Sequence, residues 1–273
     1  MKIFISADIE GIAGVMQPAQ CTPGSAEHQL ARALMEGEVN AAIEGAFDGG
    51  ASEVVVADSH GAMTNLRPDH IDPRARLVQG KPRLLSMVEG LEQQAYDGLM
   101  FIGYHSAAGE HGVLAHTING RAFHQVRIND EIMSESDIYA AAGAEHGVPL
   151  WLVSGDDTLQ RWIGEHYPHT HYACVKRSIS NTATESLSPQ QACNLIRSAA
   201  QQAVKNASPE IATRIQPPYR LELRVTRPVL ADLFCLIPDV ERLDAVTVGY
   251  NATRMATLTG LLGAFSYLAS TQF

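Results

Sequence analysis

The chain has 273 residues, of which 45% are hydrophobic and 18% charged, so it can bury a substantial core in one large or two modest domains. Its 20 basic and 30 acidic residues give a formal net charge of −10. This acidic balance, without any basic run, argues against nucleic acid or an anionic membrane as a partner, because both are bound by clustered Lys and Arg.

Hydrophobic spacing in the first two thirds of the chain predicts alternating strands and helices. A buried strand over Lys2–Ala7 precedes a helix over residues 27–47, which Gly49 and Gly50 end. The further predicted strands are 53–57, 99–103, 149–153 and 171–176, and the further predicted helices are 86–92, 133–146 and 157–166. Such alternation is typical of an α/β fold with a mostly parallel, Rossmann-like sheet flanked by helices.

Two features interrupt this alternation. Asn119 and Gly120 lie between the apolar runs 113–118 and 121–128 and predict a β-hairpin, since both residues tolerate a positive φ. After about residue 180 come a predicted helix over 189–204, a Pro217-Pro218 break, two short strands and a closing helix. We therefore predict an α/β domain over residues 1–183 and a smaller C-terminal α+β domain over 184–273.

The sequence also predicts where the protein works in the cell. Only a few apolar residues separate Met1 from Asp8, too few for an export signal. The longest apolar stretch, Met255–Ala269, is shorter than the ~20 residues that a membrane-spanning helix needs. The four cysteines are far apart and are expected to be free thiols in a reducing compartment. We expect a cytoplasmic protein.

Metal-ligand side chains follow three of the predicted strands. Asp8 and Glu10 follow the first strand, His60 the second and His105 the third. Ligands of open parallel sheets bind beyond the carboxyl ends of the strands, so these side chains are expected at one edge. Two adjacent carboxylates repel each other unless a cation joins them, and mixed carboxylate and imidazole ligation suits Zn²⁺, with Mn²⁺ as an alternative. The pattern predicts a hydrolytic metal centre in which a carboxylate can bridge two ions.

Each of these residues, taken alone, has a simpler explanation. An Asp at a strand end usually caps a turn or helix, and a lone His is usually structural. We expect Asp58 to orient His60, and Asp156 to cap the helix that follows it. The absence of a GxGxxG fingerprint after the first strand and of a GxSxG elbow argues against a dinucleotide enzyme and a serine hydrolase.

The segment Ser6-Ala7-Asp8-Ile9-Glu10-Gly11 has the form SxDxEG. Further motifs follow it at residues 58–60, 86–90, 103–105, 115–117, 128–130, 155–157 and 188–189. Through these motifs, with their similar spacing, the chain resembles the M55 family of D-aminopeptidases over essentially its whole length. The members of that family are binuclear zinc peptidases.

The resemblance implies two Zn²⁺ per subunit, held by a bridging carboxylate and four further ligands: Asp8 (bridging), Glu10, His60, His105 and Glu135. Strand-end reasoning does not find Glu135, which by itself indicates only a first-turn acid favourable to the helix dipole. Ser134 stands where the family has a Gly. His116 matches the family's proposed catalytic His, a general base or nucleophile, whereas its position alone indicates a packing residue of the predicted hairpin.

The resemblance further implies an aminopeptidase that removes N-terminal D-amino acids, of the D-Ala type, from short peptides and forms a closed homodecamer. A metal-dependent amidase or phosphoesterase acting on another small molecule could use the same ligands. The lack of a Gly-rich phosphate cradle or an Arg cluster near the site argues against the phosphoesterase. A non-catalytic binding module is the third alternative, and it would hold no zinc.

Overall fold

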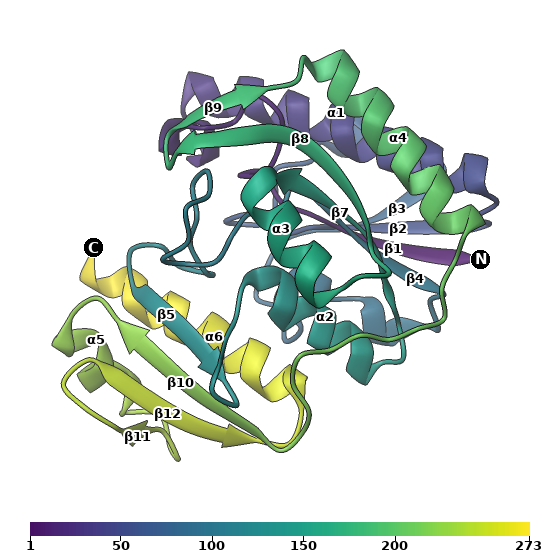
Figure 1. The fold of residues 1–273 in the computed structure, drawn as a ribbon. Helices are drawn as coiled ribbons and strands as arrows, with labels where there is room; N and C mark the ends of the chain where they lie inside the picture. The colour runs from purple at the N-terminus through teal and green to yellow at the C-terminus, as the bar shows by residue number, and fades with distance from the viewer.

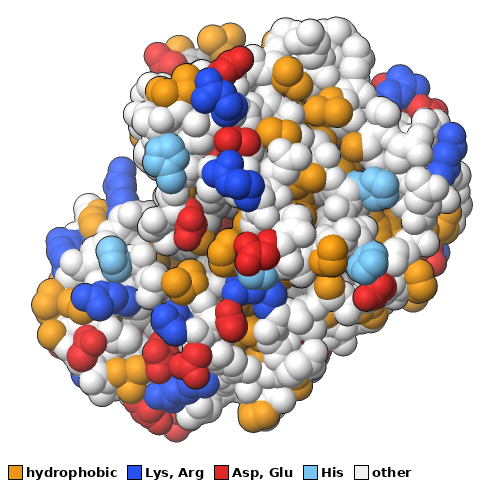
Figure 2. All heavy atoms as spheres, viewed as in Figure 1, with side chains coloured by type: hydrophobic (Ala, Val, Ile, Leu, Met, Phe, Trp, Pro, Cys, Tyr) orange, Lys and Arg blue, Asp and Glu red, His pale blue; other side chains and the backbone are white.

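The computed structural model describes residues 1–273 and contains two sheets, each covered by helices (Figure 1). The larger sheet has seven strands in the order β3-β2-β1-β4-β7-β8-β9, and the smaller has five in the order β11-β12-β10-β5-β6. None of the helices combines the length and the apolar character needed to cross a membrane. On the face drawn in Figure 2, acidic and basic side chains are interspersed over both parts of the molecule.

All neighbouring strands of the larger sheet run parallel except the last pair, β8 and β9. Its strands are β1 (Lys2–Ala7), β2 (Glu53–Asp58), β3 (Ala75–Val78), β4 (Gly98–Ile102), β7 (Leu150–Asp156), β8 (His171–Ser180) and β9 (Ala183–Ser186). The predicted mostly parallel α/β sheet is confirmed. The strands β3 and β9 were not predicted, because each has only four residues and β9 has little apolar character.

Helices cover both faces of this sheet, which explains why its central strands are almost continuously hydrophobic. Helices α1 (Ala26–Gly49) and α4 (Pro189–Lys205) pack side by side on one face (Figure 1). Helices α2 (Glu135–Glu145) and α3 (Asp157–His166) contribute to the core on the other face. Side chains of β1 alternate accordingly: Ile3 and Ile5 join the core under α1 and α4, and Phe4 joins the core on the opposite face.

The smaller sheet is antiparallel and combines segments from distant parts of the chain. Its strands are β5 (Phe123–Ile128), β6 (Glu131–Ile132), β10 (Tyr219–Val225), β11 (Glu241–Arg242) and β12 (Thr247–Ala252), and it packs with α5 (Pro228–Phe234) and α6 (Met255–Ala269). The predicted smaller α+β unit next to the parallel sheet is thus present. A domain boundary between residues 183 and 184 stays a prediction.

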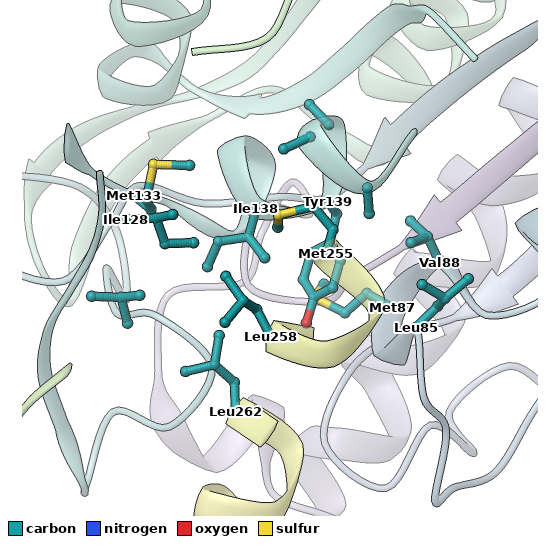
Figure 3. Packing of buried hydrophobic residues seen from close by; sticks show 14 of the residues in the cluster. Leu85, Met87, Val88, Ile128, Met133, Ile138, Tyr139, Met255, Leu258 and Leu262 are labelled. Atoms are coloured by element: carbon teal, nitrogen blue, oxygen red, sulfur yellow. The ribbon is translucent and has the colours of Figure 1, made fainter. Parts of the chain in front are cut away.

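Helix α6 joins the two parts of the molecule. Figure 3 shows Leu258 and Leu262 of α6 next to Ile138 of α2, and Met255 near Met87. These side chains are almost completely buried. Because burying a large apolar side chain contributes about 1.5–3 kcal/mol, this contact fixes α6 firmly against the parallel sheet's helices.

The predicted hairpin at Asn119-Gly120 is wrong. Residues 113–118 form an irregular loop, and only Phe123–Ile128 of the second run is a strand. The Asn119 side chain accepts hydrogen bonds from the backbone N–H groups of Arg121 and Ala122, which makes a local turn instead of a hairpin. The tight turn lies later, at Asn129 and Asp130, whose φ values are 52° and 66°.

The short helix predicted over residues 86–92 is not a continuous helix. The segment forms two 3₁₀ turns, η3 (Ser86–Val88) and η4 (Leu91–Gln93). Gly90 separates them with a φ of 100°, which ends helical geometry. The turn η3 lies against the ends of β1 and β2 and therefore approaches the predicted metal edge.

Candidate metal centre

The structure brings all six predicted site residues together. Strand β1 lies between β2 and β4, so the parallel register delivers the residues after each strand to one edge. Asp8 and Glu10 follow β1, and His105 follows β4; each is at most 4% exposed. Glu135 is the first residue of α2 and equally buried. His116 reaches the same place from the loop before β5.

The imidazole ring of His60 points its Nδ1 at the carboxylates of Asp8 and Glu10. Its Nδ1 lies 3.3 Å from Asp8 Oδ1 and 3.0 Å from Glu10 Oε2. Its Nε2 lies 2.8 Å from the carbonyl oxygen of Cys21. A carbonyl oxygen can only accept, so Nε2 carries a hydrogen and Nδ1 faces the carboxylates. Nδ1 would donate to them in the protonated ring and would offer a lone pair to a metal ion in the neutral ring. This is the orientation of a metal-binding imidazole supported by a backbone carbonyl.

His105 is held in the same way with its two nitrogens exchanged. Its Nδ1 donates to the Ser106 carbonyl oxygen at 3.0 Å. Its Nε2 faces Asp8 Oδ2 at 3.4 Å and Glu135 Oε2 at 3.6 Å and can offer a lone pair to a metal ion once the ring is neutral. These distances exceed those of charge-assisted hydrogen bonds, about 2.7–2.9 Å. The imidazole thus faces two carboxylates without bonding either of them.

His116 completes a third such arrangement. Its Nδ1 donates to the Leu114 carbonyl oxygen at 2.8 Å, and its Nε2 lies 3.8 Å from Glu135 Oε1. The ring stacks on that of His105, with 4.2 Å between centroids and 14° between planes. The side chain is 24% exposed, so it lies between the buried ligands and open space.

The donor set fits divalent cations. Glu10 Oε2 and His105 Nε2 are buried without any hydrogen-bond partner. Leaving a buried acceptor unpaired costs about 1–3 kcal/mol, so such atoms indicate a missing partner. Ligand atoms fall into two groups with separations within 4.8 Å: Asp8, Glu10 and His105, and His105, His116 and Glu135. Carboxylate oxygens and imidazole nitrogens are ligands that zinc accepts.

The protonation equilibria of these groups are strongly coupled. Burial alone would raise the pKa of Asp8, but His105 and His60 beside it hold that pKa well below its usual value. Burial alone would lower the pKa of His105, but the charges of Glu135 and Asp8 raise it well above its usual value. The same negative field that attracts protons attracts metal cations, so metal binding there releases protons.

The loop that carries Glu10 is tied down by backbone contacts. The Gly11 N–H donates to the Gly103 carbonyl oxygen at 2.7 Å and joins the end of β1 to that of β4. The buried ammonium of Lys176 donates to the carbonyl oxygens of Glu10, Ile12 and Val15. Burial lowers the pKa of Lys176 to about 8. These bonds define the backbone position of Glu10.

A buried hydroxyl network lies beneath the site. Ser6 Oγ is 2.7 Å from both Ser59 Oγ and Tyr104 Oη and donates to the Met87 carbonyl oxygen at 2.8 Å. It therefore connects β1 to the residues after β2 and β4 and to η3. This gives a physical reason for the Ser of the SxDxEG motif.

Asp58 does not orient the ring of His60, so that prediction is wrong. Its carboxylate accepts hydrogen bonds from the backbone N–H groups of Asn65 and Leu66 and from the Asn65 amide. The Asn65 amide also donates to the His60 carbonyl oxygen. Asp58 therefore stabilises the loop after β2, while the Cys21 carbonyl orients the imidazole. Asp156, by contrast, caps α3 as predicted.

Ser134 suits its position before Glu135. It is the N-cap of α2 with φ −80° and ψ 171°, a conformation that does not require glycine. Its hydroxyl accepts from the Asp137 N–H, and the Asp137 carboxylate accepts from the Ser134 N–H. This capping box fixes the first turn. The Glu135 carboxylate is then positioned to accept from the Ile118 N–H at 2.6 Å.

A cavity of about 210 Å³ adjoins these residues. Asp8, His60, His116 and Glu135 are among the residues that line it. Other walls come from the 81–87 segment, from Tyr139 of α2 and from Gly263, Ser266 and Tyr267 of α6. Two basic side chains, Lys81 and Arg83, also line the cavity, and the sequence did not indicate them.

The M55 D-aminopeptidase family model matches residues 1–264. The chain belongs to this family. It is 33% identical over 258 residues to a D-aminopeptidase of Bacillus subtilis (strain 168), with 93% of each chain covered. It is also similar to the solved structure of the Zn-dependent D-aminopeptidase DppA from Bacillus subtilis, a self-compartmentalizing protease. That similarity has a TM-score of 0.93 at 30% identity and covers 99% of this chain and 98% of the other. This M55 member is therefore a metallo-aminopeptidase, as predicted.

Proposed function

We propose that this M55 member is a zinc-dependent aminopeptidase that removes N-terminal D-amino acids, of the D-Ala type, from short peptides. The observation that carries the proposal is the buried set of carboxylates and imidazole nitrogens, in which Glu10 Oε2 and His105 Nε2 have no hydrogen-bond partner. The similar Bacillus subtilis enzyme is Zn-dependent and a D-aminopeptidase, which supports both the metal and the stereochemistry.

We assign two Zn²⁺ per subunit to Asp8, Glu10, His60, His105 and Glu135. The carboxylate geometry of Asp8 supports its proposed bridging role, because Oδ1 faces His60 and Oδ2 faces His105. One oxygen is thereby available to each of two ligand groups, the first with Glu10 and the second with Glu135. Zinc, when bound, supplies Lewis acidity for hydrolysis of a peptide carbonyl.

His116 is proposed as the general base or nucleophile. The Leu114 carbonyl holds the proton on Nδ1, which leaves Nε2 free to take a proton or attack. Glu135 Oε1, 3.8 Å from Nε2, would stabilise the positive charge that protonation creates. The ring lines the cavity, so a substrate there can reach it.

The first test replaces His116 by Ala. Metal content should stay near normal while turnover falls by about 10²–10⁴-fold, the usual contribution of a general base. His124→Ala is the matched control, since His124 is exposed on β5 and does not line the cavity. Full activity in the His116 variant would rule out its catalytic role. Loss of one metal ion would make it a ligand, because Nε2 also lies within reach of the second ligand group.

The second test is metal removal with a substrate panel. A chelator should abolish hydrolysis, and zinc should restore it. The panel contains D- and L-aminoacyl substrates, short D-Ala peptides and aryl phosphates. A preference for L-substrates would overturn the stereochemical part of the proposal, and hydrolysis of phosphates alone would favour the phosphoesterase alternative.

We further propose a homo-oligomer, a decamer by family resemblance, in the cytoplasm. The similar Bacillus subtilis enzyme is a self-compartmentalizing protease, which requires several subunits around an enclosed space. The four cysteines are unpaired, in keeping with a reducing compartment. Light scattering tests the assembly: a mass near that of one chain, 29.5 kDa, would contradict it.

A further inference from the structure

The cavity beside the metal centre has a cationic side formed by Lys81 and Arg83. Arg83 Nη1 donates to the Asp58 carbonyl oxygen at 2.9 Å. Asp58 precedes the proposed ligand His60 by two residues, a chain length of at most about 7 Å. The Arg83 guanidinium therefore contacts the backbone close to the proposed metal site. Lys81 Nζ lies 5.2 Å from the centroid of the Tyr267 ring, which belongs to the α6 wall.

These two cations lie near each other without a close carboxylate partner. Neither forms a salt bridge with an acidic side chain, and Arg83 Nη2 is buried without a hydrogen-bond partner. The charges of Asp58 and Glu89 act on the Arg83 guanidinium, but both carboxylates form hydrogen bonds with backbone N–H groups and neither forms a salt bridge with it. Burial and the neighbouring Arg83 together lower the pKa of Lys81, so the pair is held at an electrostatic cost.

An anion between the two side chains would remove that cost. Arg and Lys are the side chains that bind carboxylate and phosphate groups, and Arg does so with paired donors. Asp8, His60, His116 and Glu135, where the proposed chemistry takes place, line the same cavity. The cavity, about 210 Å³, is below the range of roughly 300–1,000 Å³ for drug-sized ligands, so it suits a molecule of only a few residues.

We propose that Lys81 and Arg83 bind the C-terminal carboxylate of the substrate and thereby select very short peptides with a free carboxylate. This inference rests on the proposed aminopeptidase function. A substrate with its amino end at the metal centre presents its carboxylate to the cationic side only if few residues lie between them. Longer chains and C-terminal amides lose the ion pair. Tyr267, beside Lys81, makes α6 part of the same subsite.

The first experiment compares D-alanyl-D-alanine with its C-terminal amide. Wild-type enzyme should have at least a tenfold higher kcat/KM for the free acid. Arg83→Gln and Lys81→Gln should each reduce that ratio by about tenfold, because a charge-assisted hydrogen bond is lost, and Arg83→Lys should keep part of it. Arg74→Gln is the matched control, since Arg74 is exposed and paired with Asp72. Equal kcat/KM for acid and amide in wild type, or an unchanged ratio in Arg83→Gln, would overturn the inference.

Two further probes separate this inference from the proposed function. D-Alanine p-nitroanilide has no carboxylate, so its hydrolysis supports the D-aminopeptidase whatever Lys81 and Arg83 do. Failure to cleave any D-aminoacyl substrate would defeat the proposed function and the inference that rests on it, whereas cleavage with equal kcat/KM for acid and amide would defeat the inference alone. Calorimetric titration of the zinc-loaded protein with N-acetyl-D-alanine measures carboxylate binding without turnover. Binding should weaken about tenfold in Arg83→Gln. Inorganic phosphate binding more tightly than the carboxylate, through the same residues, would overturn the carboxylate assignment.

Discussion

Replacing Gly11 by Ala should displace the loop that carries Glu10. A Cβ at this position would lie 2.0 Å from the Tyr104 carbonyl oxygen and 2.6 Å from that of Gly103. Side-chain Cβ atoms essentially never come within 3.0 Å of such neighbours, so the two backbones must separate by about 1 Å or more. No side-chain rotation relieves the clash, since both neighbours are backbone atoms. The Gly11 N–H bond to Gly103 would be lost with the separation.

A movement of this size exceeds what a metal site tolerates. Ligand distances need to stay within about 0.2 Å of their ideal values, and Glu10 and His105 lie on the two backbones that separate. Loss of ligand support typically reduces metal affinity by about 10–100-fold, which we expect for zinc in Gly11→Ala. Overpacking also costs about 1–3 kcal/mol of stability, equivalent to a fall in Tm of several degrees for a chain of this size.

Competition with a chromophoric chelator measures zinc affinity, and circular dichroism measures Tm. The control is Gly164→Ala on the exposed side of α3, where an added Cβ meets nothing within 4 Å. That variant should keep its zinc affinity and gain about 0.5–1 kcal/mol of stability, since Ala favours the helix. Wild-type zinc affinity and Tm in Gly11→Ala would refute the reasoning that this close approach holds Glu10 in place.

Two further predictions concern the supports of the same loop. Lys176→Met leaves the carbonyl oxygens of Glu10, Ile12 and Val15 without their buried donor and should lower the free energy of unfolding by about 3 kcal/mol, measured by urea denaturation; an unchanged midpoint would contradict this. The Glu38 carboxylate accepts a hydrogen bond from the Ala13 N–H of this loop, and burial raises the pKa of Glu38 from its usual 4.5 to about 7. Between these pH values the folded protein retains a proton on Glu38 that the unfolded chain has released, so the contribution of Glu38 to stability is greatest below pH 4.5 and falls by about 3 kcal/mol as pH rises to 7. Glu38→Gln should remove this part of the slope when unfolding is compared with wild type across pH, and parallel curves would disprove it.

The predictable part of the site depends on strand geometry. Asp8, Glu10, His60 and His105 were predicted from residue type and position, because parallel strands with adjacent register end at the same edge. Glu135 could not be found in this way. An acid in the first turn of a helix is favourable on its own, and the capping box of Ser134 and Asp137 resembles that of any helix. Only the family resemblance indicated that Glu135 is a metal ligand and not simply a favourable first-turn acid.

The failures have local causes. Asn119-Gly120 has the composition of a hairpin turn, but the Asn119 side chain bonds the next backbone N–H groups and ends the run. Lys81 and Arg83 precede a 3₁₀ turn and show no pattern by themselves. They become a pair only because the segment folds over the end of β2 and meets α6, a contact between residues almost 190 positions apart in the chain.

The orientation of the three imidazoles was unpredictable for a more general reason. His60, His105 and His116 are each held by a backbone carbonyl oxygen, from Cys21, Ser106 and Leu114. Every residue type has such an oxygen, so no sequence pattern marks the support. The arrangement therefore depends on where the loops run, and substitutions at the three supporting side chains leave the carbonyls in place. The proposed ligands can be recognised in the sequence by their residue types, whereas the orientation of the three imidazole rings is set by backbone carbonyl groups that the sequence does not mark.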